Sequence, residues 1–338
     1  MSGRLRHARR AAKRALLSRG LHVSRLPADE RRFLTALVDD RVPLPASARE
    51  LRSDAPRLAE LRAAYALADP AVRVHSRWTD DVITPWLDLA YFRGDNAYVW
   101  QYREGRRVSE LKYLVYLQDL LQRDRPGLLD RLGEDGAFGC WTFEFDGLPR
   151  CSRDLLDSVN ELLFLDDALG VLGGSCPRVL DVGAGYGRLA HRYVAAVPDV
   201  DDYCCVDAIP ESSFLCEYYL QHRQVSPPAR VVPLPEVTAL APGSFDLAVN
   251  VHSWSECTLD AISWWVDQLV RLEVPQLFVV PNEAEGFLSL EVDGRRHPFL
   301  PVLEAGGYRL VRDEPAFSPA VRAALAMRDR HCLFERRT

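Results

Sequence analysis

Three alternating glycines follow a short apolar segment near the middle of the chain. Residues 177–188 read P-R-V-L-D-V-G-A-G-Y-G-R, and residues with helical spacing come next. A strand, a glycine turn and a helix in this order form the first unit of a nucleotide-binding α/β sheet. Glycine suits such a turn because the backbone bends tightly and must approach a ligand without Cβ atoms in the way. The pattern predicts a ligand site formed by Gly183, Ala184, Gly185, Tyr186 and Gly187.

An acidic residue lies on each side of this turn. Asp181 comes just before the glycines, and Asp207 ends a second apolar segment about twenty residues after them. An acid in the second position commonly accepts hydrogen bonds from ribose hydroxyls. An acid in the first position adds negative charge where a pyrophosphate would bind, whereas it suits a sulfonium or ammonium group. The pair, with Ala208 beside it, favours S-adenosylmethionine (SAM) over NAD and places Asp181 near the methionine end.

Other nucleotide sites fit the glycine spacing less well. The sequence reads G-x-G-x-G and not the dinucleotide fingerprint G-x-G-x-x-G. No Lys-Ser or Lys-Thr pair follows, which excludes a phosphate-binding P-loop. A Rossmann-like domain that binds NAD, or no nucleotide, stays open as the alternative.

Strand-like and helix-like patterns alternate along the second half of the chain. The strand-like segments are residues 179–182, 203–206, 231–232, 247–251, 276–280, 308–311 and 331–334. Alternation with a late strand pair predicts an α/β fold, a doubly wound Rossmann-like sheet whose ligands lie at the carboxyl ends of its strands. Pro235 and Glu236 follow the third strand, where such folds contact adenine.

Three regions are expected along the chain. Residues 1–28 contain eight basic residues and no acid, which predicts a basic arm. A solvated arm is favoured over one that contacts an acidic partner or a membrane surface. Residues 29–150 are expected to be a mainly helical lid that binds the acceptor. Residues 151–338 are expected to be the SAM-binding domain.

Aromatic residues alternate in the segment before the first long helix of this lid region. Tyr98, Trp100 and Tyr102 share one face of an extended segment, with Gln101 between them. Proteins hold sugar rings with flat aromatic faces and planar hydrogen-bonding groups. The segment is therefore a candidate sugar-binding surface, and an ordinary aromatic core at a domain seam is the alternative.

Polar residues cluster after the fourth and fifth strands. The fourth strand ends in N-V-H-S-W-S-E-C, in which Asn250 is assigned to the cofactor site. Methyl transfer to an alcohol needs a base or a metal because the hydroxyl has a high pKa. His252 is the candidate base, since a histidine titrates near neutral pH. Glu256, four residues later, would orient His252 if the segment turns helical.

Asn282 and Glu283 follow the fifth strand and are expected to face the same cleft, where they would bind acceptor hydroxyls. With Glu256 they could also bind a divalent ion, but the spacing matches no metal signature, so no metal is assigned. His75 and His297 are weaker base candidates because no motif surrounds either of them.

Composition limits the class of protein. The chain has 338 residues, 48% of them apolar, which is enough for one large or two modest domains. A net charge of −6 argues against general nucleic-acid binding. Eight cysteines without zinc spacing are expected to be reduced thiols in a cytoplasmic protein. No apolar run has the length of a membrane span, and no signal-peptide pattern is present.

Several longer segments are similar to one known family. They are Y-V-W-Q-Y-R (98–103), L-G-E-D-G-A-F-G-C-W-T-F-E-F (132–145), S-R-D-L-L-D-S-V-N-E (152–161), V-H-S-W-S-E-C (251–257) and V-P-N-E (280–283). With the glycine motif, these segments resemble the sugar O-methyltransferase family of bacterial natural-product and surface-glycan gene clusters. The resemblance covers most of the chain from about Trp78. It implies a SAM-dependent enzyme with a Rossmann-like fold and a sugar hydroxyl as acceptor.

The sequence thus predicts a SAM-dependent O-methyltransferase for a nucleotide sugar, glycoside or glycan. One alternative is methylation of a polyketide hydroxyl, an amine or a carboxylate. Another is a SAM-binding partner protein without catalytic activity. The sequence leaves the sugar, the hydroxyl position and the oligomeric state, including a homo-oligomer, open.

Overall fold

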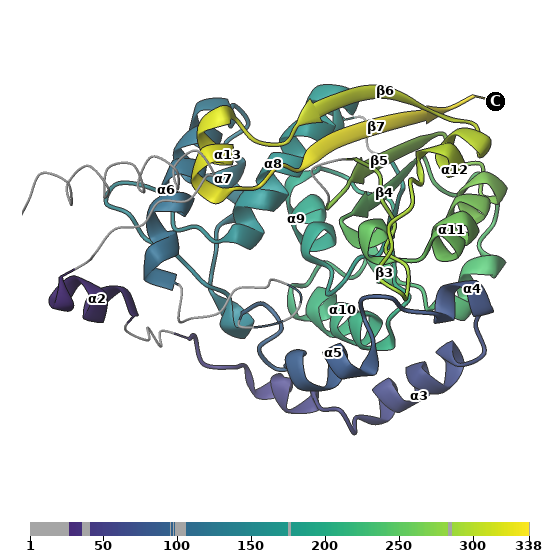
Figure 1. Ribbon diagram of the computed structural model, residues 1–338, viewed down its shortest axis with the longest axis horizontal. Helices are drawn as coiled ribbons and strands as arrows, with labels where there is room; N and C mark the ends of the chain where they lie inside the picture. Colours follow the sequence, from purple (N-terminus) through teal and green to yellow (C-terminus); the bar gives the residue numbers. More distant parts are fainter. Residues whose placement is uncertain are drawn as a thin grey trace, which may run out of the picture.

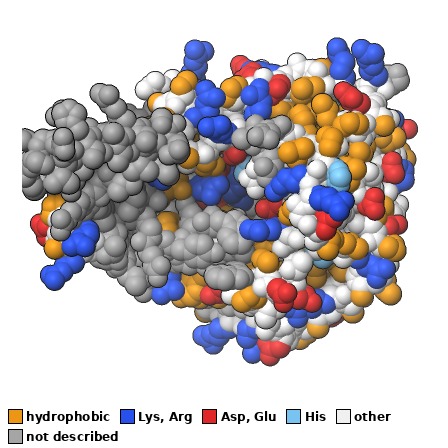
Figure 2. All heavy atoms as spheres, viewed as in Figure 1, with side chains coloured by type: hydrophobic (Ala, Val, Ile, Leu, Met, Phe, Trp, Pro, Cys, Tyr) orange, Lys and Arg blue, Asp and Glu red, His pale blue; other side chains and the backbone are white. Residues whose placement is uncertain are grey.

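The computed structural model describes residues 27–35, 41–94, 96, 98, 106–174, 177–282 and 286–337. The predicted basic arm (except residues 27 and 28), Trp100, Gln101, Tyr102 and Glu283 lie outside the described residues. Within the described part of the chain, no helix is long and apolar enough to span a membrane. Figure 2 shows one face of the molecule, on which described side chains of both charges are interspersed with hydrophobic ones.

A seven-stranded sheet of order β3-β2-β1-β4-β5-β7-β6 forms the centre of the molecule (Figure 1). β3, β2, β1, β4 and β5 are parallel, whereas β7 is antiparallel to both β5 and β6. Because β1 lies between β2 and β4, the strand order reverses there, and open α/β sheets bind ligands at such a point. The predicted fold class is confirmed. The strands are β1 (Val179–Val182), β2 (Tyr203–Val206), β3 (Ala229–Val231), β4 (Leu247–Val251), β5 (Gln276–Val280), β6 (Tyr308–Pro315) and β7 (Arg330–Arg336).

Helices cover both faces of the sheet and extend the fold on its N-terminal side (Figure 1). Those after residue 150 are α8 (Arg153–Leu169), α9 (Arg188–Ala196), α10 (Pro210–His222), α11 (Leu259–Arg271), α12 (Leu300–Ala305) and α13 (Pro319–Leu325). Those before it are α2 (Ala28–Thr35), α3 (Pro56–Tyr65), α4 (Pro70–Arg73), α5 (Asp80–Trp86), α6 (Arg106–Arg123) and α7 (Leu128–Leu132). Short 3₁₀ helices are η1 (Ala46–Glu50), η3 (Ala137–Gly139), η4 (Val171–Gly173), η5 (Leu234–Ala239) and η6 (Ser253–Glu256).

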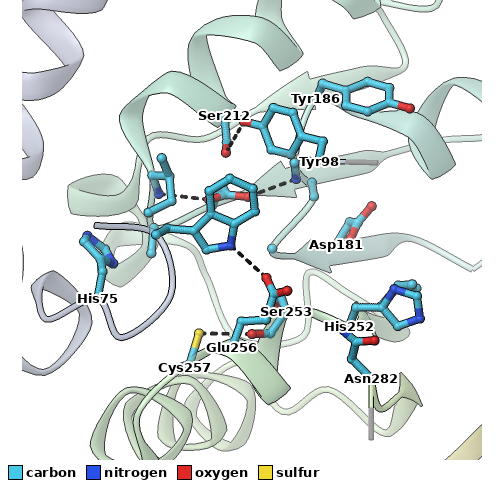
Figure 3. A pocket seen from close by; sticks show the side chains of 18 of the residues that line it. His75, Tyr98, Asp181, Tyr186, Ser212, His252, Ser253, Glu256, Cys257 and Asn282 are labelled. Carbon is cyan, nitrogen blue, oxygen red and sulfur yellow. Dashed lines mark hydrogen bonds between the residues drawn. The ribbon is translucent and has the colours of Figure 1, made fainter. Parts of the chain in front are cut away.

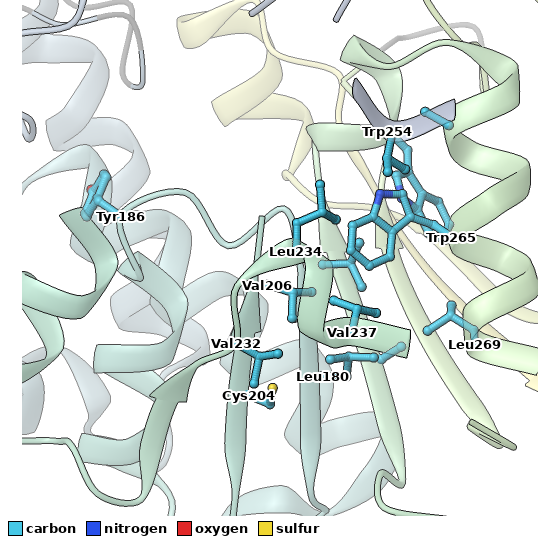
Figure 4. Close-up of a cluster of buried hydrophobic side chains, with 14 of the residues drawn as sticks. Leu180, Tyr186, Cys204, Val206, Val232, Leu234, Val237, Trp254, Trp265 and Leu269 are labelled. Carbon is cyan, nitrogen blue, oxygen red and sulfur yellow. The ribbon is translucent and has the colours of Figure 1, made fainter. Parts of the chain in front are cut away.

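All four residues of β1 are buried, and alternate ones face opposite sides of the sheet. Leu180 and Val182 join a core that includes residues of α11 and α12, part of which Figure 4 shows. Val179 joins a second core with residues of α6, α8 and α9. Asp181 is two residues after Val179, so its carboxyl group faces the α8 and α9 side of the sheet.

Four ionised side chains meet in the interior where the N-terminal region meets the sheet domain. The Arg93 guanidinium lies 2.9 Å from Glu134 and 3.1 Å from Asp154, and Arg192 lies 3.0 Å and 3.3 Å from the same two carboxylates. Each side chain is at most 3% exposed. Burial alone would raise the pKa of Asp154, but Arg93 and Arg192 hold that pKa well below its usual range. The cluster joins a turn after α5, a loop after α7, and helices α8 and α9.

The same cluster holds the start of α8 and the glycine turn in place. Ser152 caps α8 by accepting a hydrogen bond from the Leu155 N–H (3.0 Å), and it donates one to Glu134 (2.6 Å). The Tyr186 hydroxyl, within the glycine turn, donates to Asp154 (2.6 Å). The segments around residues 134 and 154 therefore build the support beneath the turn.

We expect Arg93→Ala to lower the free energy of unfolding by about 3–5 kcal/mol, because two buried carboxylates would lose a partner. Arg52→Ala is the matched control, since Arg52 and its partner Asp54 are 64% and 74% exposed. That change should cost less than about 1 kcal/mol. Urea unfolding of both variants checks the difference, and equal losses would contradict the role of the buried cluster.

Candidate active site

A cavity of about 390 Å³ lies at the carboxyl ends of β1, β2 and β4. Its volume is within the usual range for small-molecule sites. Of the residues expected from the sequence, those that line it are Tyr98, Asp181, Gly183, Ala184, Gly185, Tyr186, Asp207, Ala208, His252, Glu256 and Asn282. Gly187, Pro235, Glu236 and Asn250 do not line it. Among the weaker base candidates, His75 lines the cavity and His297 does not.

The three glycines of the turn have different roles, although all have a positive φ of 58° to 85°. A Cβ on Gly183 would lie 2.1 Å from Ser253 Oγ, and one on Gly187 would lie 2.9 Å from Cys216 Sγ. Both glycines therefore allow close internal packing. A Cβ on Gly185 would meet only ring carbons of Tyr98, at 3.8 and 3.9 Å. Gly185 is thus the position where the turn leaves room for a ligand.

Asp207 holds the turn from the end of β2. Its carboxylate accepts hydrogen bonds from the backbone N–H of Gly185 (2.9 Å) and of Ile209 (2.8 Å). The residue is 8% exposed, and burial raises its pKa to about 6 in spite of these bonds. A carboxylate oxygen has two lone pairs, so Asp207 retains acceptor capacity for ligand hydroxyls.

Asp181 lies within β1 and is 4% exposed. It accepts a hydrogen bond from the Tyr203 hydroxyl (2.9 Å) on the neighbouring strand. Burial raises the pKa of Asp181 to about 7, although the bond from Tyr203 favours the ionised form. Arg188 already offsets part of this desolvation, and a cationic group bound beside Asp181 would offset more of it.

His252 follows β4 in the left-handed backbone region, with φ of 66°. Its N–H donates to the Val280 carbonyl at the end of β5 (2.8 Å), which fixes the residue between two strand ends. Its Nε2 lies 3.4 Å from Asp329 Oδ2, within ion-pair distance but without hydrogen-bond alignment. Asp329 lies just before β7, far away in sequence, so no local pattern indicated it.

Glu256 does not hold His252 as the sequence analysis expected. Its carboxylate instead accepts a hydrogen bond from Trp78 Nε1 (2.8 Å). Burial raises the pKa of Glu256, while the bond from Trp78 lowers it. The physical reason is the short η6 turn, which directs Glu256 toward Trp78 in the N-terminal region, whereas the acid beside His252 is Asp329, from the segment between α13 and β7.

The side chain of Asn250 is hydrogen-bonded to neighbouring groups of the protein. Its amide Nδ2 donates to the Val182 carbonyl (2.8 Å) and to Ser253 Oγ (2.7 Å), and its Oδ1 accepts from the Trp254 N–H (3.2 Å). These bonds join the ends of β1 and β4. Its assignment to the cofactor, like those of Pro235 and Glu236 on η5, stays a prediction.

Residues 72–78, here called the strap, form part of the cavity wall through Val72, Val74, His75 and Trp78. Figure 3 shows His75 at the edge of the cavity. His75 makes an antiparallel bridge with Cys257, and Ser76 Oγ donates to the Glu256 carbonyl (2.9 Å). The Trp78 ring lies 5.2 Å from the Tyr98 ring, and the Tyr98 hydroxyl bonds Ser212 Oγ (2.7 Å). Trp78 and Tyr98 thus form an aromatic pair on the cavity wall, with the Tyr98 ring beside Gly185. No sequence motif marks Trp78 as a site residue.

No metal centre is seen in the described part of the chain, where no group of three or more His, Cys, Asp or Glu is placed to hold an ion. The seven cysteines that the structure describes are free thiols.

Comparisons with known proteins find a likeness in fold alone. No family model and no curated protein matches the chain. The 4+2 cyclase SpnF is 17% identical over 66% of this chain and 96% of its own, with a TM-score of 0.43. The 1,6-didemethyltoxoflavin N1-methyltransferase of Burkholderia thailandensis, solved with 1,6-didemethyltoxoflavin and S-adenosylhomocysteine, is 19% identical over 54% and 79%, with a TM-score of 0.41. Mitomycin 7-O-methyltransferase MmcR is 16% identical over 54% and 57%, with a TM-score of 0.38.

The three proteins differ from one another in reaction. One is described as a cyclase and two as methyltransferases.

We expect Glu256→Ala to loosen the strap, because Trp78 Nε1 would lose its acceptor. Hydrogen exchange of the amides of residues 72–78 should become roughly tenfold faster, as for the loss of one charge-assisted hydrogen bond. Glu256→Gln keeps an acceptor oxygen and is the matched control. Wild-type exchange rates in Glu256→Ala would show that the strap is held by other contacts.

Asp181 and Asp207 each favour the folded state at low pH and lose that contribution as pH rises. Their folded pKa values, about 7 and about 6, lie above the ordinary aspartate value of 3.8. Between these limits the two groups bind more protons in the folded state than in the unfolded state, so their contribution to the free energy of unfolding declines with pH. Asp181→Asn removes one such contribution, so we expect its free energy of unfolding, measured relative to that of the wild type, to rise between about pH 4 and pH 7. Urea unfolding across that range checks it, and parallel curves would contradict it.

Proposed function

We propose that this chain is a SAM-dependent methyltransferase that acts on the hydroxyl of a sugar in a nucleotide sugar, glycoside or glycan. The observation that carries the proposal is the cavity at the strand ends. It gathers the glycine turn, two buried carboxylates and a histidine fixed between strand ends.

The residues present fit SAM. Gly185 leaves room at the turn, Asp207 has acceptor capacity for ribose hydroxyls, and Asp181 suits a cationic group. When bound, the cofactor would supply an electrophilic methyl group on a positively charged sulfur. The Trp78 and Tyr98 rings on the cavity wall would help to exclude water from the reacting groups.

His252 is the proposed general base. A neutral imidazole nitrogen would accept the proton of the acceptor hydroxyl as its oxygen forms the new bond to carbon. The left-handed backbone and the bond to Val280 hold the ring at the strand end. Asp329, 3.4 Å from Nε2, would stabilise the imidazolium that results.

The sugar acceptor is supported by the motif resemblance and by aromatic side chains near the cavity. Trp78 and Tyr98 provide ring faces, and Glu256 and Asn282 provide polar groups, which together suit a sugar ring. The same resemblance supports a role in bacterial natural-product or surface-glycan biosynthesis.

We expect SAM and S-adenosylhomocysteine to bind with micromolar affinity in calorimetric titrations, and NAD not to bind. Asp207→Ala should weaken the binding of both ligands by roughly tenfold or more, because their hydrogen bonds to the Asp207 carboxylate are lost. Binding of NAD alone would overturn the cofactor assignment. No binding of any of the three would remove the basis for an enzyme of this class.

Methyltransferase activity is then measured with a series of candidate acceptors, starting with nucleotide sugars. We expect His252→Ala to lower kcat by about 10²- to 10⁴-fold, the usual contribution of a general base, while SAM affinity is kept. Full activity of this variant would favour an acceptor that needs no base, such as a carboxylate.

A further inference from the structure

A second cavity, of about 480 Å³, lies between α6, α8 and the strand pair β6 and β7. It shares no lining residue with the cavity at the strand ends, and its volume is within the range of small-molecule sites. Charged side chains of both signs line it. They are Arg123, Arg125 and Arg312, and Asp166, Asp167 and Glu314.

Two buried polar side chains also line this second cavity. Asn160 is 2% exposed and His331 is 5% exposed. Asn160 Nδ2 donates to the Ala316 carbonyl (2.8 Å) and its Oδ1 accepts from Arg123 (2.9 Å), so this amide is already bonded within the protein. The His331 ring packs against the Phe164 ring (5.0 Å between ring centres), but no residue in the described part of the chain hydrogen-bonds to it. Its nitrogens are therefore left for a ligand.

The His331 ring is neutral at ordinary pH. Burial lowers the pKa of His331 to about 3; Asp329 opposes this fall, whereas Arg123 and Arg312 add to it. A neutral imidazole has one N–H that donates and one nitrogen that accepts. A hydroxyl group also donates and accepts, so it matches either nitrogen of the ring.

The charged groups of the wall balance one another. Arg312 forms ion pairs with both Asp167 and Glu314, and Asp166 accepts a hydrogen bond from the backbone N–H of Leu172 (2.8 Å). With three guanidinium and three carboxyl groups, the wall has no net charge to attract either an anion or a cation. Many donors and acceptors without a net charge suit an uncharged ligand that carries several hydroxyl groups.

We propose that the second cavity binds an uncharged sugar unit and that His331 hydrogen-bonds to one of its hydroxyls. The guanidinium and carboxyl groups around His331 provide donors and acceptors for the neighbouring hydroxyls. A sugar ring holds these hydroxyls in fixed directions, so it loses less conformational freedom on binding than an open-chain polyol would. This site is separate from the one that the proposed function uses.

The wall of the second cavity is joined to the proposed catalytic residues. Ala316, which lines the cavity, donates its N–H to the Asp329 carbonyl (2.9 Å). The Asp329 carboxylate lies 3.4 Å from His252 Nε2, and His331 follows Asp329 by two residues. A sugar unit in the second cavity would therefore contact the segment that places Asp329 beside His252.

The experiment is an NMR titration of the full chain with the methyl glycosides of glucose, galactose and rhamnose, and with glucose 1-phosphate as a charged probe. We expect at least one neutral glycoside to bind more tightly than glucose 1-phosphate. His331→Phe keeps a planar ring against Phe164 but removes both nitrogens, and it should weaken that glycoside by about tenfold or more. His297→Phe is the matched control, because His297 is exposed and lines neither cavity. It should leave the affinity unchanged.

A third variant separates the two cavities, since the first is the proposed acceptor site. Asn282 lines only the first cavity, so Asn282→Ala should leave the binding of the glycoside unchanged. Weakening in Asn282→Ala with wild-type affinity in His331→Phe would place the sugar in the first cavity and overturn the proposal. Tighter binding of glucose 1-phosphate, or no binding of any glycoside to the wild type, would also overturn it. The proposed function does not depend on this result, because the SAM titration uses residues of the first cavity.

Discussion

The buried cluster of Arg93, Glu134, Asp154 and Arg192 is the constraint on which the site depends. The two guanidinium and two carboxylate groups are almost fully buried. An unpaired buried charge is energetically costly, so each group needs a partner of opposite charge. Because they come from four separate segments, the cluster forms only when the N-terminal region packs onto α8 and α9. The hydrogen bond from the Tyr186 hydroxyl to Asp154 links this cluster to the glycine turn.

A second set of internal contacts shapes the turn from the other side. Ser253 fills the space that a side chain at position 183 would need, and Asn250 ties the ends of β1 and β4 together. Asp207 holds the Gly185 N–H. Several residues that resemble ligand-binding groups in sequence are thus already engaged within the protein. A rigid turn of this kind positions a ligand with little further ordering.

Charged and aromatic groups line the cavity together. The carboxylates of Asp181 and Asp207 and the rings of Trp78 and Tyr98 are all part of its wall. The strap that carries Trp78 is bonded to Glu256, on the segment that follows His252. A hydrogen bond therefore links the strap to the segment that carries His252, so a movement of one is expected to affect the other.

The sequence by itself determined the α/β class of the fold, the glycine turn and the acids within β1 and just after β2, because these depend on local periodicity and on short spacings. It also placed His252 at a strand end. Only the tertiary structure decided the partners: Asp329 beside His252, Trp78 on Glu256, and His331 on the wall of the second cavity. Each of these contacts joins segments distant in the chain, and side-chain direction at a turn such as η6 depends on packing that no local pattern encodes.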